Sequence, residues 1–397
     1  MADNKDKKVL NVPALRFPEF SGEWKKVKVS NLLDFYPTNS LSWEQLDYNN
    51  GQIKNLHYGL IHKGLPTMVD ASFDTLPYIK EEIMPKLYTL FTEGDVAFAD
   101  ASEDTNDVAK AIEIINCDSQ QIVSGLHTIH GRDNSNQTII GYKGYAFASK
   151  AFHKQIRRIA QGTKVFSISV RNFDEVYIGI PSKEEQAKIA KLLIAIDKRI
   201  ASQNKIIEDL KKLKSALYQE MFGSLVAPTL KLGQVAEIVK GKQVNGTELL
   251  EQGDYYVMNG GTFPSGWLNK FNTEANTISI SEGGNSCGYV QYNTSRYWSG
   301  GHCYSLKILH PQEVSDLYLY HFLKWQEGNI MALRIGSGLP NIQKKDLLHF
   351  PIILPTIDKQ KSIISVLTAI DAKIACEVSL TEYYTMQKDF LLRNLFI

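Results

Sequence analysis

Three charged residues near the start of the chain have the spacing of a metal-dependent nuclease. Glu19 is followed by Glu23 and Lys25, and carboxylates with a nearby lysine are groups that can hold Mg²⁺ beside a phosphate. The surrounding stretch contains Pro18 and Gly22, which interrupt helices and strands and indicate an extended lead-in. We therefore favour a structural segment over a nuclease site.

The other catalytic patterns are incomplete. Residues 59–64 have the spacing of a phosphate-binding loop, but Leu65 stands where a lysine is required. No Asn-Pro-Pro-aromatic run, the signature of an amino-methyltransferase, occurs in the chain. His127 and His302 occupy matching places in the two halves, yet a single histidine in a predicted strand is more often a packed or hydrogen-bonded core residue. The acidic cluster at 100–104 is typical of a turn with side-chain caps. The sequence thus predicts neither a catalytic site nor a metal site.

The polar residues that remain gather in loops suited to contact DNA. Glycine permits a close approach of the backbone to a ligand. Asn, Gln, Ser and Arg pair with base edges, while Lys and Arg bind phosphates. The candidate DNA-contacting residues are Arg132, Asn134, Ser135, Lys143, Asn259, Gly284, Asn285, Ser286, Arg296, Tyr297 and Trp298. For each of them an ordinary polar loop is the alternative interpretation.

Two long helical stretches must position these loops. The stretch from Glu184 to Phe222 aligns without a gap with the stretch from Asp358 to Phe396, at an offset of 174 residues (Asp197 to Asp371). Both carry apolar residues at alternating steps of 4 and 3, which form a 3.5-residue seam typical of helices packed along their length. The seam positions are Ile189, Leu193, Ile196, Ile200, Gln203, Ile207, Leu210 and Leu217 in the first stretch and Ile363, Leu367, Ile370, Ile374, Glu377, Leu391 and Leu395 in the second.

The seam is polar at two equivalent positions, Gln203 and Glu377, near the middle of each helix. A polar seam residue can fix the register of a coiled coil. We expect the two helices to pair antiparallel, with a pseudo-two-fold axis near these residues. Each helix is a spacer with no chemistry of its own.

Composition bounds the remaining possibilities. A chain of 397 residues with 43% hydrophobic content and a formal net charge of +1 fits two or three ordinary globular domains. Cys117, Cys287, Cys303 and Cys376 lie far apart without a CxxC pair, which favours a reducing, cytoplasmic setting over a zinc site. No apolar run approaches a membrane span, and the polar stretch from Met1 to Lys8 predicts a disordered tail without a signal-peptide core.

The expected fold class is α+β, with two globular mixed α/β domains in tandem and two long antiparallel helices that make the whole pseudo-two-fold symmetric. The expected segments are 1–22 (tail and lead-in), 23–180 (first globular domain), 181–223 (central spacer helix), 224–353 (second globular domain) and 354–397 (C-terminal spacer helix). Alternating runs predict strands at Lys26–Val29, Asp95–Ala99 and Thr277–Ser281. Helices are expected at Tyr145–Ala160 and Tyr318–Trp325.

In its order of short motifs the chain resembles the specificity subunits of type I restriction-modification enzymes. The motifs are Leu15-Arg16-Phe17-Pro18-Glu19-Phe20 with Trp24, Gly94-Asp95-Val96, Ile280-Ser281-Glu282-Gly283-Gly284-Asn285, and the duplicated Pro181/Pro355, Gln186/Gln360 and Ala195-Ile196-Asp197/Ala369-Ile370-Asp371. The resemblance covers nearly the whole chain, and the order and duplication of the motifs make it specific.

The resemblance implies that the globular domains are target-recognition domains that read a bipartite site on double-stranded DNA. It implies assembly with two modification (methyltransferase) subunits, which would bind S-adenosylmethionine, and with ATP-dependent restriction subunits for cleavage. The chain itself would be non-catalytic and need no cofactor. A non-catalytic protein-interaction or scaffold module with a coiled-coil spacer is the alternative.

Overall fold

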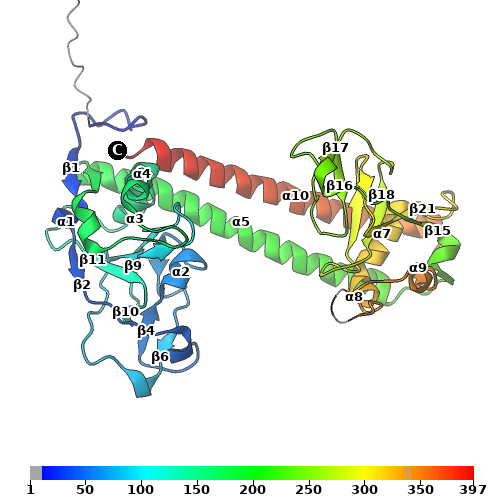
Figure 1. Cartoon of the computed structure of the whole chain (residues 1–397), viewed down its shortest axis with the longest axis horizontal. Helices are drawn as coiled ribbons and strands as arrows, with labels where there is room; N and C mark the ends of the chain where they lie inside the picture. The colour runs from blue at the N-terminus through cyan, green and yellow to red at the C-terminus, as the bar shows by residue number, and fades with distance from the viewer. Residues whose placement is uncertain (1–10, 337, 339) are drawn as a thin grey trace, which may run out of the picture. The chain divides into compact units, whose positions relative to one another are not determined.

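The computed structural model describes residues 11–336, 338 and 340–397, so the predicted tail from Met1 to Lys8 lies outside the described residues. The chain divides into two compact units. Unit 1 comprises 11–203 together with Leu380–Ile397, and unit 2 comprises Asn204–Ser379. Each unit therefore contains part of both long helices, α5 (Lys183–Gly223) and α10 (Ile357–Asn394) (Figure 1).

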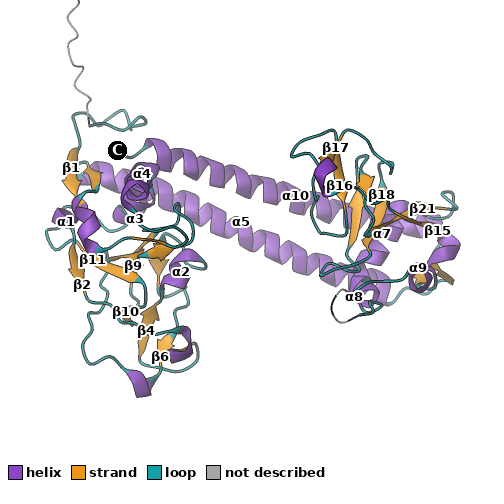
Figure 2. Ribbon diagram, in the orientation of Figure 1, coloured by secondary structure: helices purple, strands orange, loops and turns teal. Residues whose placement is uncertain are grey.

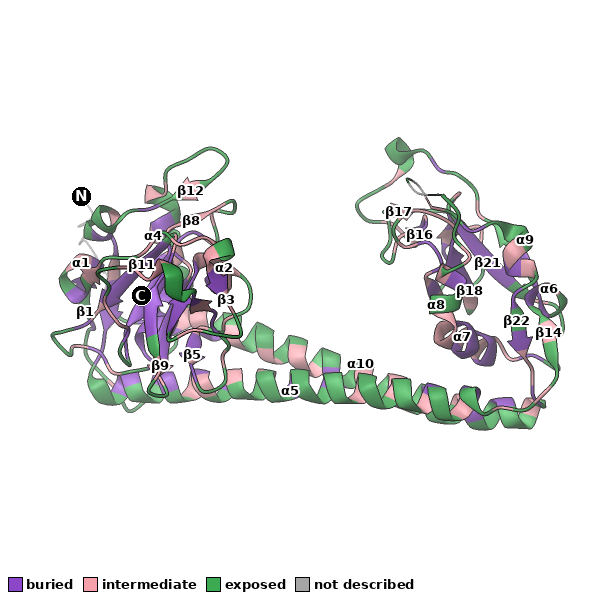
Figure 3. Ribbon diagram, turned by 90° about the horizontal axis from the view of Figure 1, so that it is seen from below, coloured by how far each residue is buried: buried purple, intermediate pink, exposed green. Residues whose placement is uncertain are grey.

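The long helices are confirmed almost to their ends. α5 exceeds the predicted stretch by one residue at each end, and α10 stops at Asn394, two residues before the predicted Phe396. The seam positions of both helices are buried or half-buried, while most other positions along the helices are exposed (Figure 3). Gln203 and Glu377 are buried too, at 4% and 7% exposure. They belong to different units, so their meeting near a common axis stays a prediction.

Unit 1 is built around a five-stranded sheet in the order β2-β11-β7-β9-β5, with a four-stranded sheet β10-β4-β6-β3 and the pairs β1-β13 and β12-β8 (Figure 2). Its further elements are β1 (Lys25–Lys28), α1 (Val29–Leu32), β2 (Asp34–Tyr36), η1 (Trp43–Gln45), β3 (Leu46–Asp47), β4 (Ile53–Leu56), α2 (Tyr58–His62), β5 (Met68–Asp70), β6 (Tyr78–Ile79), η2 (Glu81–Ile83), β7 (Val96–Ala99), β8 (Ala101–Ser102), β9 (Ala111–Asn116), β10 (Gln121–Ser124), β11 (Thr128–Arg132), α3 (Lys143–Ala148), α4 (Lys150–Ile159), β12 (Phe166–Ser167), η3 (Val170–Asp174) and β13 (Tyr177–Ile180).

Unit 2 is built around a four-stranded sheet in the order β15-β21-β18-β19, with the sheets β17-β16-β20 and β14-β22. Its further elements are β14 (Thr229–Lys231), α6 (Leu232–Val235), β15 (Ala236–Lys240), η4 (Gly246–Glu248), β16 (Tyr255–Met258), β17 (Trp267–Leu268), β18 (Thr277–Ser281), β19 (Val290–Asn293), β20 (Trp298–Ser299), β21 (Cys303–Ile308), α7 (Asp316–Trp325), α8 (Glu327–Met331), α9 (Lys344–Leu348) and β22 (Pro351–Ile353).

The two units share a frame. In each, the strand that enters the domain pairs antiparallel with the strand that leaves it just before a long helix: β1 with β13, and β14 with β22. A central strand, β7 or β18, then pairs with β11 or β21. The predicted strands at these places are confirmed. The expected helix at Tyr145–Ala160 is divided into α3 and α4, because Ser149 has extended backbone and its hydroxyl accepts from the Phe152 N–H to cap α4.

An equivalent glutamine fixes the start of each long helix. Gln186 is fully buried, and its side chain donates to the carbonyls of Pro181 and Gln137 and accepts from the Ile139 N–H. In unit 2 the side chain of Gln360 donates to the carbonyls of Pro355 and Glu313 and accepts from the Ser315 N–H. Each glutamine thereby satisfies backbone groups that burial would otherwise leave without partners.

In each unit, an aromatic residue at or just after the C-terminal end of a long helix packs against a tyrosine of the core. Phe396, just after α10, packs against Tyr142 in unit 1, and Phe222, at the end of α5, packs against Tyr318 in unit 2, each pair with ring centroids 5.8 Å apart. The hydroxyls of Tyr142 and Tyr318 donate to a carbonyl of β13 and of β22, respectively, each at 2.6 Å. Both domains are thus held by the beginning of one long helix and the end of the other.

The two sheets differ in how their outer faces are covered. In β7, Val96 and Phe98 face the cluster that includes α3 and α4, while Ala97 and Ala99 face a second apolar cluster formed with β4, α2 and β9. In β18 the helix-facing residues are again apolar, but the opposite face carries Ser279 and Ser281. In unit 1, β4 and α2 therefore contribute to an apolar layer that covers this face of the sheet.

Candidate nucleic-acid interface

Arg132 is held by a buried carboxylate. At the end of β11, its Nε and Nη2 donate to the two oxygens of Asp95, at 2.8 and 2.7 Å, and Nη2 also donates to the Leu90 carbonyl. The buried His130 contacts the same carboxylate at 2.8 Å through Nε2. Burial alone would raise the pKa of Asp95, but hydrogen bonds from Arg132, His130 and the Thr92 backbone outweigh it and keep the pKa below its ordinary value. The Nε and Nη2 groups of Arg132, which could otherwise donate two hydrogen bonds to a DNA base, are thus already bound to Asp95.

Arg132, Asn134 and Lys143 line one pocket of about 250 Å³. The exposed Asn134 amide donates to Asp34 at 2.6 Å and to the Tyr36 hydroxyl at 2.9 Å. The Ser135 hydroxyl, outside this lining, donates to Asp133 at 2.9 Å. The structure therefore brings three of the four candidates of unit 1 together, in a setting rich in carboxylates.

Lys143 is buried and its ammonium is engaged within the fold. Its Nζ lies 3.2 Å from Glu113 and 3.0 Å from the Thr138 hydroxyl. Burial raises the pKa of the Glu113 carboxyl, although the Lys143 ammonium and the N–H groups of Gly144 and Gly141 oppose this. This position is a correction to the sequence-based expectation of a surface lysine, because the sequence does not show that Glu113 lies opposite.

The first candidate loop of unit 2 is open. Gly284 has a left-handed φ of +76°, its N–H donates to the Pro340 carbonyl, and no atom lies within 4 Å of the place a Cβ would take. Asn285 is exposed, and Ser286 is half-buried and accepts from the Tyr289 N–H through its carbonyl. Asn259, after β16, instead accepts from the His302 N–H at 3.2 Å and holds that turn.

The second candidate loop alternates as a strand does. Arg296 is exposed, donates to Glu274 at 2.9 Å and lies over the Phe271 ring. Tyr297 is fully buried and stacks on Tyr256 with ring centroids 5.5 Å apart. Trp298 is half-buried. Tyr297 therefore belongs to the core, which corrects the expectation of a surface aromatic.

Both matched histidines are exposed, contrary to the expectation of packed or hydrogen-bonded core residues in strands. His127 has a left-handed φ of +54°, and its Nδ1 lies 3.0 Å from Asp100. His302 is exposed at the equivalent turn before β21. Each precedes its strand instead of lying within it. The turn predicted nearby is confirmed, since Ser102 and Asp104 side chains accept from the backbone N–H groups of residues 104 and 106.

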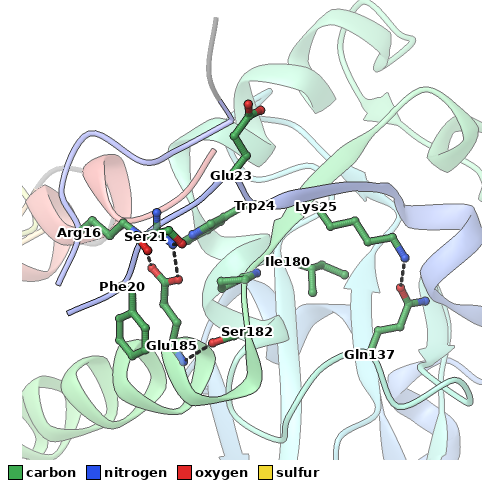
Figure 4. Close-up of a pocket in the computed structure, with 11 residues that line it drawn as sticks. Arg16, Phe20, Ser21, Glu23, Trp24, Lys25, Gln137, Ile180, Ser182 and Glu185 are labelled. Atoms are coloured by element: carbon green, nitrogen blue, oxygen red, sulfur yellow. Dashed lines mark hydrogen bonds and ion pairs between the residues drawn. The ribbon is translucent and has the colours of Figure 1, made fainter. Parts of the chain in front are cut away.

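The nuclease-like residues of the lead-in have structural partners. Glu19 pairs with Lys188 of α5, and Lys25 donates to Gln137 at 3.3 Å. Beside them Arg16 forms two hydrogen bonds of 2.8 Å with Glu185, as Figure 4 shows. The lead-in therefore straps the start of α5.

Residues 11–336, 338 and 340–397 contain no group of three or more His, Cys, Asp or Glu side chains placed to hold a metal ion. Across the same residues, no helix is long and apolar enough to cross a membrane.

Sequence reasoning missed a basic groove in unit 2. It has a volume of about 420 Å³ and lies along β15 and β21, where Lys240, Lys242 and Lys307 line it with Asn272 and Ser299. Two of the lysines flank Gly241 at the end of β15. Lysines spaced two apart at a strand end share one side of the sheet, which is the signal that could have found them.

Comparison with known proteins gives a consistent result. Residues 21–212 and 228–382 match the family model of the type I restriction modification DNA specificity domain. A putative type I specificity subunit of Mycoplasma pneumoniae is 36% identical over 166 residues, which span 42% of this chain and 44% of that protein. One from Mycoplasma genitalium is 32% identical over 161 residues, spanning 40% of this chain and 42% of that protein. The alignments thus cover less than half the length of these two relatives.

Wider alignments extend the likeness. The putative MjaX specificity subunit of Methanocaldococcus jannaschii is 25% identical over 332 residues, which span 74% of this chain and 75% of that protein. The crystal structure of a type I S subunit from M. genitalium superposes with a TM-score of 0.62 at 18% identity, over 97% of this chain and 99% of that one. A chain from a study of type I complex assembly superposes with a TM-score of 0.58 at 15% identity, over 93% and 96% of the two chains. At these identities the structural likeness establishes the fold.

Proposed function

Because the chain belongs to the type I restriction-modification DNA specificity family, we propose that it is the subunit that reads the DNA target of such a complex. The observation that carries this proposal is the duplication: the family match occurs twice in tandem, and each unit contains the same entry and exit strands and the same buried glutamine. Two equivalent frames with different loops suit two different readouts.

The proposed target is bipartite. Each globular domain contacts one short stretch of double-stranded DNA, and the long helices hold the two readers apart. One turn of DNA is roughly 34 Å, and a helix of 41 residues, at about 1.5 Å per residue, is about 60 Å long. Two readers on such a spacer can engage stretches about one turn apart and leave the bases between them unread.

The chemistry falls to partner subunits. Two modification subunits would bind S-adenosylmethionine and turn the target adenine out of the stack for methylation, and restriction subunits would add ATP-dependent cleavage in the cytoplasm. This chain's own task is to bind the duplex and dock those partners. This division is supported by the lead-in, where the residues with nuclease-like spacing contact other side chains: Glu19 pairs with Lys188, and Lys25 donates to Gln137. Arg16 beside them pairs with Glu185.

Gel retardation with the methyltransferase partner tests the proposal. The chain is purified alone and after co-expression with the methyltransferase subunits of its own system, and both are titrated with duplex DNA of random sequence. We expect tight, sequence-selective retention and methyl transfer from S-adenosylmethionine only in the presence of the partner. Turnover of S-adenosylmethionine by the pure chain would contradict the proposal. Co-purification of the partner without any DNA binding would instead favour a protein-interaction scaffold.

A further inference from the structure

Arg132 and Lys307 occupy the same place in the two sheets. Arg132 follows the last pair between β11 and β7, and Lys307 follows the last pair between β21 and β18. The neighbouring residue on the central strand is Asp95, just before β7, in unit 1, and Thr277, at the start of β18, in unit 2. The two cations therefore face different surroundings within the same frame.

The difference decides whether the charge is available. The guanidinium of Arg132 forms an ion pair with the buried Asp95. In unit 2 the Thr277 hydroxyl donates to the Glu274 carbonyl at 2.8 Å, and no carboxylate takes the place of Asp95. In the described part of unit 2, the Lys307 ammonium has neither a hydrogen bond nor an ion pair; Glu237 lies opposite on β15 but forms no ion pair with it.

Lys242 shares the groove with Lys307 and is equally available. It is exposed, and among the described residues its ammonium has no partner. Glu274, which also lines the groove, pairs with Arg296 at 2.9 Å, and Glu282 pairs with Lys240 at 2.7 Å. Lys242 and Lys307 are thus the lysines of the groove whose ammonium groups have no partner among the described residues.

Hydrogen bonds join the segments that form the groove. The Asn272 side chain accepts from the Ser299 N–H at 2.7 Å and donates to the Ser299 carbonyl at 3.0 Å, which ties the strand β20 to the segment before β18. The Lys242 carbonyl accepts from the Trp298 indole at 2.9 Å. Two free lysines on this hydrogen-bonded surface offer point charges to an extended anion.

We propose that this groove, lined by Lys242 and Lys307, binds the phosphates of one DNA strand and sets the orientation of unit 2 on the duplex. The inference rests on the proposed function and deepens it. Phosphates fit because they are regularly spaced anions, and lysine contacts to them position a protein without reading sequence. The matching place in unit 1 is lined by Glu93, Asp95 and Asp133, and its cations Arg132 and Lys143 are paired with Asp95 and Glu113, so we assign the backbone contact at this position to unit 2 alone.

The test uses the complex of the full chain with its methyltransferase partner. The double variant K242Q/K307Q and the control K345Q, which alters an exposed lysine on α9, are titrated with target and non-target duplexes at several salt concentrations. Each lost phosphate contact lowers the slope of log affinity against log salt by about 0.9. In the double variant we expect the slope of log affinity against log salt to be smaller in magnitude by about 1.8, and the affinity to fall about tenfold on both duplexes. The methylated sequence should stay unchanged.

Three results would overturn the inference: a slope and affinity equal to those of the unaltered complex, an equal loss in K345Q, or a changed methylated sequence, which would indicate base contact. Because both lysines are exposed and their ammonium groups have no partner among the described residues, we expect the double variant to keep its unfolding temperature. Measuring that temperature shows that the variant is folded. Absence of DNA binding by the unaltered complex would instead refute the proposed function.

Discussion

Lys388, near the end of α10, forms an ion pair with Asp197 of α5, with 2.6 Å between Nζ and Oδ1. In unit 2 the same pair recurs with the helices exchanged, between Lys214 of α5 and Asp371 of α10. The lysines are equivalent under the sequence repeat, and so are the aspartates. The same two positions of the sequence repeat therefore pair in both units, and one repeated sequence supplies both halves of both contacts.

The pair in unit 1 should contribute measurably to stability. Asp197 also accepts from the Tyr145 hydroxyl at 2.7 Å, so Asp197→Ala leaves two donors without an acceptor. We expect a loss of about 1–2 kcal/mol, against about 0.5–1 kcal/mol for Lys388→Met. Calorimetric unfolding of both variants and of Asp389→Asn, at an exposed neighbour, measures this. Losses in Asp389→Asn as large as in Asp197→Ala would rule out a specific role for the pair.

The two buried glutamines should be equally important. Gln186→Ala or Gln360→Ala removes three hydrogen bonds from a fully buried site. Each should cost about 2–3 kcal/mol, because buried backbone groups lose their partners. Gln219→Ala and Gln387→Ala, on exposed faces of the same helices, should stay within about 0.5 kcal/mol. Urea unfolding compares the four, and a neutral Gln360→Ala would show that the clamp in unit 2 is dispensable.

Acid should weaken unit 2 through His321. This side chain is 2% exposed, its Nδ1 lies 3.1 Å from the Tyr218 hydroxyl, and burial lowers its pKa to about 4. An unfolded histidine titrates near 6.5. The unfolded state therefore takes up the proton first, and stability falls as the pH drops from about 6.5 toward 4.

Between pH 7 and pH 5 we expect this one group to cost about 1–2 kcal/mol of stability. His321→Gln removes the titration and should flatten that part of the pH profile, even if the variant is less stable at pH 7. His302→Gln, at an exposed position, is the control. Unfolding temperatures at the two pH values give the comparison, and a profile that keeps its slope in His321→Gln contradicts the assignment.

Asn285 is the candidate base reader that the structure leaves most available, since it is exposed beside the open Gly284 turn. Asn285→Ala should cost about 1–3 kcal/mol of target binding and relax one base position. The salt dependence should not change, because no phosphate contact is lost. Selection of bound duplexes from a random pool shows the preferred bases, and a uniform loss on all sequences would point to a backbone contact.

The sequence predicts those structural features that depend on residues close together in the chain. The helices α5 and α10 follow from a seam that repeats within each helix. By contrast, the engagement of Arg132 depends on Asp95, 37 residues earlier, and no spacing rule joins them. Tyr297 follows the polar stretch Asn293 to Arg296, which suggests a surface loop, although the alternation of exposed Arg296 and buried Tyr297 is itself a strand pattern.

The candidate site was less predictable than the frame. Loop composition selected Asn285, which is exposed, but it also selected Lys143, which is buried at the start of α3 against Glu113 of β9. The free charge of Lys307 becomes visible only when the two sheets are compared position by position. Availability of a side chain is a property of its surroundings in space, which composition does not contain.

A domain exchange tests the central claim most directly. Residues Lys231 to Phe350 are replaced by the equivalent segment of a relative with a different target, which leaves β22 and both long helices in place. The chimera is expressed with the methyltransferase partner, and the methylated motif is read by sequencing of the methylated genome. We predict that one half of the motif changes while the other half and the gap stay the same. A simultaneous change of both halves, or a changed gap between unchanged halves, would contradict the account.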